Sequence, residues 1–138
     1  MIWTTSEIEY DGLPLLLRKP DHINVWRFKS TLTRLLCVEH ILNKVSPDGL
    51  PEKQYNSTLS EFDHHMCSVF DNSSEGIIFL IETYGGKRSY YYYTTPNFIS
   101  NSLIEIAKQQ FEVKLESWSQ EDIGWGFLDD YPVTLFTD

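Results

Sequence analysis

Cysteine and long apolar runs are both scarce in this chain. Its 138 residues include two cysteines, Cys37 and Cys67, too few for the disulfide framework of a small secreted protein. We predict that both are reduced and lie in or near the core. The longest uninterrupted apolar run, Ile77 to Ile81, is far too short to cross a bilayer, so no membrane segment is predicted. The first residues lack the basic stretch and apolar core of a secretory signal, which favours a cytoplasmic location.

Basic residues are also few. Eleven Lys and Arg stand against 20 Asp and Glu, giving a net charge of -9. After Lys114 there is no Lys or Arg at all, while acidic residues continue to the last position. Because a phosphate backbone requires a basic surface, direct nucleic-acid binding is disfavoured and a basic protein partner is favoured. The alternative is that acidity merely keeps the protein soluble.

Catalytic and metal-binding motifs are missing as well. In the pentad Asp63 to Cys67, only His64 and Cys67 could meet on a helix, and no second Cys/His cluster completes a metal site. Nothing in the sequence singles out a third group to orient that pair for catalysis. Cys37 and His40 are three residues apart on a predicted strand, so their side chains leave from opposite faces. We predict no catalytic residue, metal or cofactor, and therefore a non-enzymatic protein.

The clearest element that is present is a β-hairpin from Gly76 to Thr95. Ile77 to Ile81 is an apolar run rich in β-branched residues, and Ser89 to Tyr93 resumes with aromatic strand formers. Between them, Gly85-Gly86 supplies the positive φ angles that a tight turn needs. This stretch specifies architecture rather than chemistry.

Two further strand regions precede this hairpin. Trp3 to Tyr10 alternates loosely, Asp11-Gly12 is a turn signal, and Leu13 to Arg18 is a second apolar run, which together predict an N-terminal hairpin. Thr31 to Leu42 predicts a strand. Its run Leu35 to Val38 has no polar face, which suits a central strand covered on both sides, although periodicity alone also permits a buried helix.

Helices are predicted on either side of the central hairpin. Between Glu52 and Phe70 the apolar residues follow a helical stripe: Tyr55, Leu59, Phe62, Met66, Val69 and Phe70. A second helix is predicted to start with Thr95 as N-cap and Pro96 at the first position. Its inward face would carry Ile99, Leu103, Ile106 and Gln110. The last strand is predicted from Phe111 to Glu116, with Phe111, Val113 and Leu115 inward.

This order predicts the fold class. Residues 31–118 read strand, helix, strand, strand, helix, strand, which is the split βαβ order of a ferredoxin-like α+β fold. An N-terminal hairpin at 1–20 would extend or cap the sheet, and an acidic aromatic tail would occupy 119–138. No linker is long enough to divide the chain, so residues 1–138 are predicted to form one domain.

The four tyrosines at 90–93 are one candidate binding surface. Side chains alternate along a strand, so we predict two buried and two exposed, and assign Tyr91 and Tyr93 to partner binding. Tyrosine offers a large contact area with a polar end and few rotors. The alternative is that cross-strand aromatic pairs stabilise the sheet with no partner. Base stacking on RNA is disfavoured because only Lys87 and Arg88 supply a basic rim.

The acidic tail is the second and principal candidate surface. It combines aromatic anchors with carboxylates that could steer a basic partner. The predicted contact residues are Trp118, Glu121, Asp122, Phe127, Asp129, Asp130 and Tyr131. The alternative is that the aromatic residues close the core while the acids form a solvated rim, and we expect Trp125 at least to do so.

Short segments spread along the chain carry a resemblance to a known family. They are Trp3 with Tyr10-Asp11-Gly12-Leu13-Pro14, Asp48-Gly49-Leu50-Pro51 before a helix, Gly85-Gly86-Lys87-Arg88 before a tyrosine-rich strand, and Asp122-Ile123-Gly124-Trp125 followed by Tyr131-Pro132. They resemble the bacterial family catalogued as domain of unknown function 695. The likeness spans nearly the whole chain, and the sequence departs from the usual pattern at 28–41 and 127–130.

The resemblance implies a class of function. The family is similar in layout to a ferredoxin-like regulator that binds and inhibits a bacterial ribonuclease, and such domains occur among immunity proteins that neutralise toxic effectors of neighbouring bacteria. It supplies no catalytic residue. We therefore expect an immunity protein of contact-dependent growth inhibition, which binds a cationic toxin such as a nuclease. The alternative is a regulator of an endogenous ribonuclease. The oligomeric state stays open.

Overall fold

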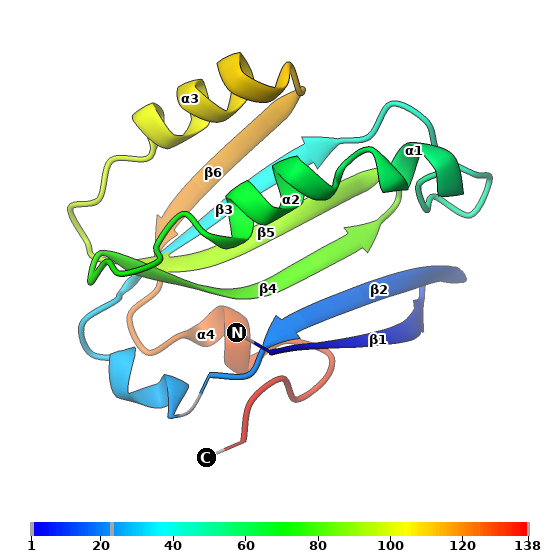
Figure 1. Ribbon diagram of the computed structural model, residues 1–138. Coiled ribbons are helices and arrows are strands. Elements are labelled where there is room, and N and C mark those ends of the chain that lie inside the picture. Colours follow the sequence, from blue (N-terminus) through cyan, green and yellow to red (C-terminus); the bar gives the residue numbers. More distant parts are fainter. Residues whose placement is uncertain (1, 23, 138) are drawn as a thin grey trace.

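Six antiparallel strands form one sheet in the computed structural model, which describes residues 2–22 and 24–137 (Figure 1). In sheet order the strands are β1 (Trp3–Tyr10), β2 (Leu13–Pro20), β4 (Gly76–Tyr84), β5 (Lys87–Thr94), β3 (Arg34–Ile41) and β6 (Leu115–Glu121). The helices of the described residues are the 3-10 helix η1 (Val25–Phe28), α1 (Lys53–Ser57), α2 (Ser60–Cys67), α3 (Asn101–Phe111) and α4 (Gly126–Asp129). The fold is therefore α+β. None of the described helices is long and apolar enough to cross a membrane.

Two tight turns define the hairpins of the sheet. β4 and β5 pair antiparallel across Gly85 and Gly86, whose φ angles of 59° and 85° lie where glycine carries no steric cost. The central hairpin predicted from the sequence is confirmed. β1 and β2 pair in the same way across Asp11 and Gly12, with φ angles of 52° and 81°.

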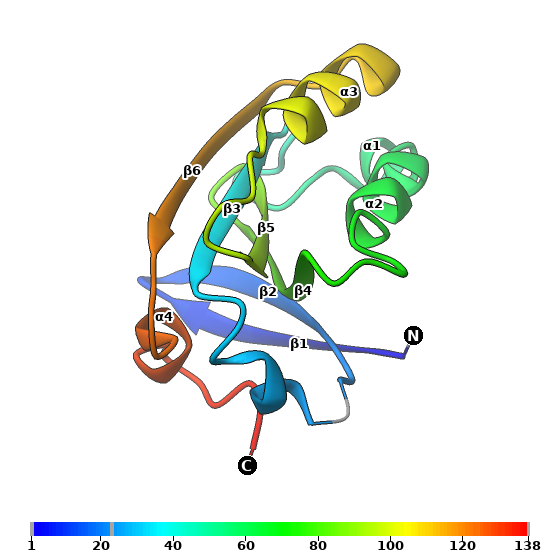
Figure 2. The same ribbon diagram turned by 90° about the vertical axis from the view of Figure 1, so that its left-hand side faces the viewer.

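The sheet is covered unequally on its two faces. α1, α2 and α3 lie on one side, whereas α4, η1 and the C-terminal segment lie against part of the other (Figure 2). Each side has its own core: Phe62, Met66 and Tyr92 belong to the helix side, and Phe79 and Trp125 to the other. β3 lies between β5 and the edge strand β6, and its residues 35–38 are at most 2% exposed. The prediction of a strand covered on both faces is thus confirmed, although β3 stands one place from the edge of the sheet rather than at its centre.

The helix predicted over 52–70 is interrupted. α1 ends at Ser57 and α2 begins at Ser60. The Ser57 hydroxyl donates to the Gln54 carbonyl oxygen at 2.7 Å, and the Thr58 hydroxyl donates to that of Tyr55 at 2.6 Å. Such hydroxyls compete for backbone oxygens inside a helix, so a helix tends to bend or end there. The apolar stripe still points inward, since Phe62 and Met66 are buried.

The predicted start of the next helix is wrong, and of its predicted inward residues Leu103 packs against the core whereas Ile99 and Ile106 do not. Residues 95–100 form a turn rather than a first helical turn, and α3 begins at Asn101. Its buried residues are Ile104 and Ala107, whereas the predicted Ile99 and Ile106 are 74% and 54% exposed. The Thr95 amide donates to the Glu75 carbonyl oxygen at 2.9 Å, which ties residue 95 to the segment before β4 and leaves Ile99 outside the helix.

The last strand also lies further along the chain than predicted. Phe111 ends α3, Glu112 adopts a left-handed φ of 51°, and β6 occupies Leu115–Glu121 instead of 111–116. Pairing decides the position, since β6 joins β3 in register from His40 opposite Leu115 to Arg34 opposite Glu121. The first residues of the predicted tail therefore belong to the sheet.

A loop and a turn from distant parts of the sequence lie against each other. The Gly86 amide donates to the Gly49 carbonyl oxygen at 2.8 Å. A β-carbon on Gly49 would stand 3.0 Å from the backbone of Gly85, and Gly49 has a φ of 87°. Close backbone approach and a positive φ both require glycine here. The Asp48-Gly49-Leu50-Pro51 segment is thereby docked on the β4–β5 turn.

Candidate functional site: an acidic and aromatic groove

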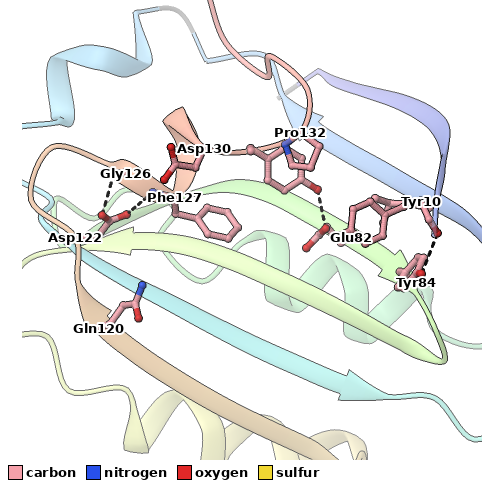
Figure 3. A pocket seen from close by; sticks show the side chains of 11 residues that line it. Tyr10, Glu82, Tyr84, Gln120, Asp122, Gly126, Phe127, Asp130 and Pro132 are labelled. Atoms are coloured by element: carbon pink, nitrogen blue, oxygen red, sulfur yellow. Dashed lines mark hydrogen bonds between the residues drawn. The ribbon is translucent and has the colours of Figure 1, made fainter.

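A groove of about 570 Å³ opens on the face of the sheet opposite α1, α2 and α3 (Figure 3). It lies where β4, the end of β6 and the C-terminal segment meet, beside the end of β1. Its lining residues are Tyr10, Leu15, Glu82, Tyr84, Gln120, Asp122, Gly126, Phe127, Asp130, Tyr131 and Pro132. None of these lining residues is Lys, Arg or His, so the groove is acidic. We call it the acidic groove below.

The three carboxylates of the acidic groove have different surroundings. Asp130 is exposed, and no hydrogen bond engages its carboxylate among the described residues. Glu82 is half-buried and accepts the Tyr131 hydroxyl at 2.6 Å. Asp122 accepts three hydrogen bonds, from the Gly126 and Phe127 amides at 2.9 and 3.1 Å and from the Tyr93 hydroxyl at 2.7 Å. Asp130 and Glu82 are therefore the carboxylates best placed for a ligand, and Asp122 is held by the fold.

The phenol groups donate to these carboxylates in their protonated form. Burial and the neighbouring Glu82 raise the pKa of Tyr131 well above its ordinary value. Burial and the hydrogen bond to Asp122 raise the pKa of Tyr93 in the same direction. At neutral pH both phenols keep their protons and leave the negative charge on the carboxylates.

Aromatic rings form much of the rest of the wall. Phe127 of α4 stacks on Tyr91 of β5 with ring centroids 4.8 Å apart, and Tyr131 lies 5.7 Å from Phe127. At the other end, the rings of Tyr10 and Tyr84 meet edge to face at 5.7 Å, and the Tyr84 hydroxyl donates to the Tyr10 carbonyl oxygen at 2.9 Å. The groove therefore presents aromatic rings next to its carboxylates.

The structure brings together part of the predicted contact set. Asp122, Phe127, Asp130 and Tyr131 line the acidic groove, and Asp129 is exposed beside it on α4. On β6, side chains alternate, so Trp118 shares the face of the groove whereas Glu121 leaves from the other face. Trp118 is 38% exposed, and its indole nitrogen donates to Glu39 at 3.2 Å.

The prediction of two exposed tyrosines is wrong. Tyr90, Tyr92 and Tyr93 are each 0% exposed, and Tyr91 is only half-buried. Tyr93 is covered by Trp125, whose ring stacks on it at 4.4 Å with an interplanar angle of 6°. Side chains alternate along β5, so two of these tyrosines point to each face of the sheet. Because both faces are covered at this place, neither pair is fully exposed to solvent. Tyr93 is therefore a core residue and not a contact surface.

The Asp122 to Trp125 segment serves the fold. Trp125 is 0% exposed, as expected, and its indole nitrogen donates to the Leu32 carbonyl oxygen at 2.7 Å. Asp122 accepts the amides that open α4, which satisfies donors that a helix start leaves free. Asp122, which the sequence predicts to contact a partner, therefore also stabilises the start of α4.

Lining residues of the acidic groove that were not predicted from the sequence include Glu82 and Tyr84 of β4 and Tyr10 of β1. Glu82 is the one charged residue in the Gly76–Tyr84 strand, and the alternation of that strand indicates which of its residues share a face. Tyr10 gives no such signal, since only the folded sheet brings it to Tyr84, 74 residues away. Gln120 was missed because the last strand was expected to end at 116.

The predicted separation of Cys37 and His40 onto opposite faces of a strand is confirmed. Cys37 is 0% exposed on the groove side of β3, whereas His40 faces Phe62 on the helix side with ring centroids 4.9 Å apart. Burial raises the pKa of both Cys37 and Cys67 to about 12, so both are thiols rather than thiolates at neutral pH. Within residues 2–22 and 24–137, no group of three His, Cys, Asp or Glu side chains is arranged to hold a metal ion.

The chemistry of the acidic groove is that of cation recognition. Exposed carboxylates bind guanidinium and ammonium groups by charge-assisted hydrogen bonds, and aromatic faces attract the same cations.

Comparison with known proteins found no matching family model, no matching curated protein and no matching solved structure.

Proposed function

We propose that this chain is a cytoplasmic, non-enzymatic binding protein of the immunity type that occludes a basic toxin, such as a nuclease. The observation that carries the proposal is the acidic groove, in which Glu82 and Asp130 stand beside Phe127 and Tyr131 with no cationic lining residue. A nuclease holds nucleic acid with Lys and Arg, and those side chains are complementary to such a groove. The net charge of -9 would speed the encounter with a basic partner.

The arrangement of the strands supports a ferredoxin-like core, which is part of this proposal. In chain order, β3, α1 with α2, β4, β5, α3 and β6 follow the split βαβ pattern, and their strands lie in the order β4-β5-β3-β6. The β1–β2 pair extends this sheet beside β4. A ferredoxin-like core of this kind agrees with the resemblance to domain of unknown function 695.

The first experiment reverses the exposed charges of the acidic groove. Asp129→Lys with Asp130→Lys leaves the hydrogen bonds of Asp122 in place. Against the toxin encoded beside its gene, this double variant should associate more slowly, by about tenfold or more at low salt, and its rate should depend less on ionic strength. Stopped-flow association measured over a range of salt concentrations tests this.

A matched control has the same change in net charge on the other side of the sheet. Glu61→Lys with Glu105→Lys alters two exposed residues of α2 and α3. If both double variants slow association equally, only net charge matters and the acidic groove is not the contact surface. Unchanged association of the Asp129/Asp130 variant would exclude that surface outright.

The alternative partner is an endogenous ribonuclease. It would use the same groove, because a ribonuclease is also basic where it holds RNA. Parallel titrations against the neighbouring toxin and against the cell's own RNA-processing ribonuclease separate the two, since only the true partner should lose activity at equimolar protein.

A further inference from the structure

A second pocket, on the helix-covered side of the sheet, contains two arginines. It has a volume of about 290 Å³ and is bounded by β1, β2, β4, β5 and the α1–α2 segment. Its lining residues are Thr5, Leu16, Arg18, Asn56, Leu59, Ser60, Asp63, Ile81, Thr83 and Arg88. Thr83 and Glu82 are consecutive on β4 and so point to opposite faces. This arginine pocket is therefore separate from the acidic groove, and its function does not depend on the one proposed above.

One arginine of the pocket has its own carboxylate. Arg18 donates to both oxygens of Asp63, at 2.9 and 2.5 Å, in a bidentate pair. The Tyr90 hydroxyl also donates to Asp63, at 2.8 Å. Burial alone would raise the pKa of Asp63, but the hydrogen bonds and charge of Arg18 outweigh burial and hold that pKa below its ordinary value. Asp63 is thus ionised and already engaged.

The other arginine has no carboxylate of its own. Arg88 is 8% exposed, and among the described residues no carboxylate lies within ion-pair distance of its guanidinium. Its Nε donates to the Thr83 hydroxyl at 3.0 Å, and its Nη2 donates to the Asn56 amide oxygen at 2.9 Å. Both acceptors are neutral, and no bond engages Nη1 within the described residues. Arg88 lines the pocket, and its guanidinium therefore has donor capacity left at Nη1 and no anionic partner within ion-pair distance among the described residues.

The local charge balance points to an anionic ligand. Two guanidiniums share one carboxylate, which leaves one positive charge in a protein whose net charge is -9. Burying an unpaired charge is unfavourable, and a bound anion would relieve that cost. We propose that this pocket binds a small molecule through one oxyanion, a phosphoryl or carboxylate group, held by Arg88.

The remaining lining suits such a group. Thr5, Ser60 and Thr83 bring hydroxyls, and Asn56 brings an amide, all of which can bond oxyanion oxygens. Leu16, Leu59 and Ile81 supply apolar walls for the body of the ligand. Pockets of about 300 Å³ with a few polar groups among apolar walls are typical of small-molecule sites.

Calorimetric titration of the full chain with inorganic phosphate and, separately, with acetate tests the proposal. We expect saturable one-to-one binding of at least one of them, with a dissociation constant on the order of 1 mM. Tighter phosphate binding assigns the site to phosphoryl groups, and tighter acetate binding to carboxylates. Ionic strength is kept constant with chloride, so that the screening of the protein's charges does not change during the titration.

Two variants with a matched control locate the binding. Arg88→Met should abolish it, whereas Lys87→Met removes the same charge from the neighbouring residue on the opposite face and should not change it. Asn56→Asp places a carboxylate where Nη2 of Arg88 now meets an amide oxygen. It should abolish anion binding and raise the melting temperature, so the test holds even if Arg88→Met fails to fold.

Either of two results would overturn the proposal. One is the absence of saturable binding of phosphate and acetate to the unaltered protein. The other is binding that survives Asn56→Asp with the same affinity, which would place the anion elsewhere.

Discussion

At the scale of single residues, Asp122 links the predicted contact surface to the fold. It lies in the acidic groove, yet its oxygens accept two backbone amides and the Tyr93 hydroxyl. Hydrogen bonds to a charged acceptor are stronger than neutral ones, and removal of the acceptor leaves the buried donors without partners. A loss of partner binding in an Asp122 variant would therefore mix two causes.

Asp122→Ala should destabilise the protein by about 2–3 kcal/mol, because one charged acceptor of three hydrogen bonds is lost. Asp129→Ala, an exposed change on the same short helix, should stay within about 0.5 kcal/mol of the unaltered protein. Urea denaturation followed by tryptophan fluorescence measures both. Equal losses would show that Asp122 does not hold α4.

His40 should make stability depend on pH in the acidic range. Its ring is 2% exposed, its Nδ1 has no hydrogen-bond partner among the residues that the structure describes, and burial with the charge of Arg88 lowers its pKa to about 4. The unfolded chain, with an ordinary pKa near 6.5, binds the proton first as the pH falls. The stability contributed by neutral His40 is therefore complete above about pH 6.5 and is lost as the pH falls toward 4.

His40→Leu should flatten the fall in unfolding free energy between pH 6.5 and 4 by on the order of 3 kcal/mol. His64→Gln, at an exposed histidine of α2, should leave that pH profile unchanged. Denaturation midpoints of both variants and of the unaltered protein, measured at several pH values, test this prediction. A profile that His40→Leu does not alter would mean that other groups dominate acid unfolding.

At the scale of elements, the loop at 46–51 and the β4–β5 turn stabilise each other. Ser46 and Leu50 close the loop with a backbone hydrogen bond of 2.8 Å, and the Gly86 amide donates to Gly49. Two of the segments that carry the family resemblance thus meet in space. The glycines of both segments are selected by backbone geometry, so at Gly49, Gly85 and Gly86 the resemblance concerns folding rather than recognition.

Gly49→Ala should cost more stability than Gly12→Ala. Both glycines have a positive φ, 87° and 81°, so both variants suffer the same backbone strain of about 1–2 kcal/mol. A β-carbon at Gly49 would also stand 3.0 Å from the Gly85 backbone, whereas one at Gly12 would have no atom of residues 2–22 and 24–137 beyond its chain neighbours within 4 Å. We expect an additional loss of about 1–3 kcal/mol from overpacking at Gly49. Equal denaturation midpoints would contradict the docking of this loop.

At the scale of the whole molecule, the sheet depends on cover from both sides. The side opposite α1, α2 and α3 is closed by Trp125, Leu128 and Leu135, which pack over Phe79 and Tyr93. Trp125, Leu128 and Leu135 all belong to residues 119–138, the segment that the sequence indicated as a binding tail. The same short segment therefore closes a core and forms one wall of the acidic groove.

A chain ending at Glu121 should lose cooperative folding. Each large apolar side chain removed from this core contributes about 1.5–3 kcal/mol, and the total stability of such a domain is only about 5–15 kcal/mol. We expect loss of the near-ultraviolet circular dichroism signal and binding of a hydrophobic dye. Leu128→Ala alone should remain folded with a loss of about 2–5 kcal/mol. A truncated chain that still unfolds cooperatively would show that this cover is dispensable.

Local sequence signals determined the central hairpin, the buried β3 strand and the acidic character of the C-terminal segment. Those signals are short-range: paired glycines permit the turn, and a run without polar residues requires cover on both faces. The helix start at 101 and the strand at 115–121 could not be read in this way, because backbone bonds to Glu75 and pairing with β3 set them. Propensity is easily overridden by such contacts.

For the candidate site, too, some features follow from the sequence and others only from the tertiary structure. The sequence by itself determined which chemistry is available, since acidic and aromatic residues gather after Lys114 with no Lys or Arg among them. Only the tertiary structure decided which of them face solvent: it buried Tyr93 under Trp125, engaged Asp122 with α4, and added Glu82 and Tyr10 to the wall. The physical reason is that residue type follows from the chain alone, whereas burial and proximity depend on the segments that fold against it.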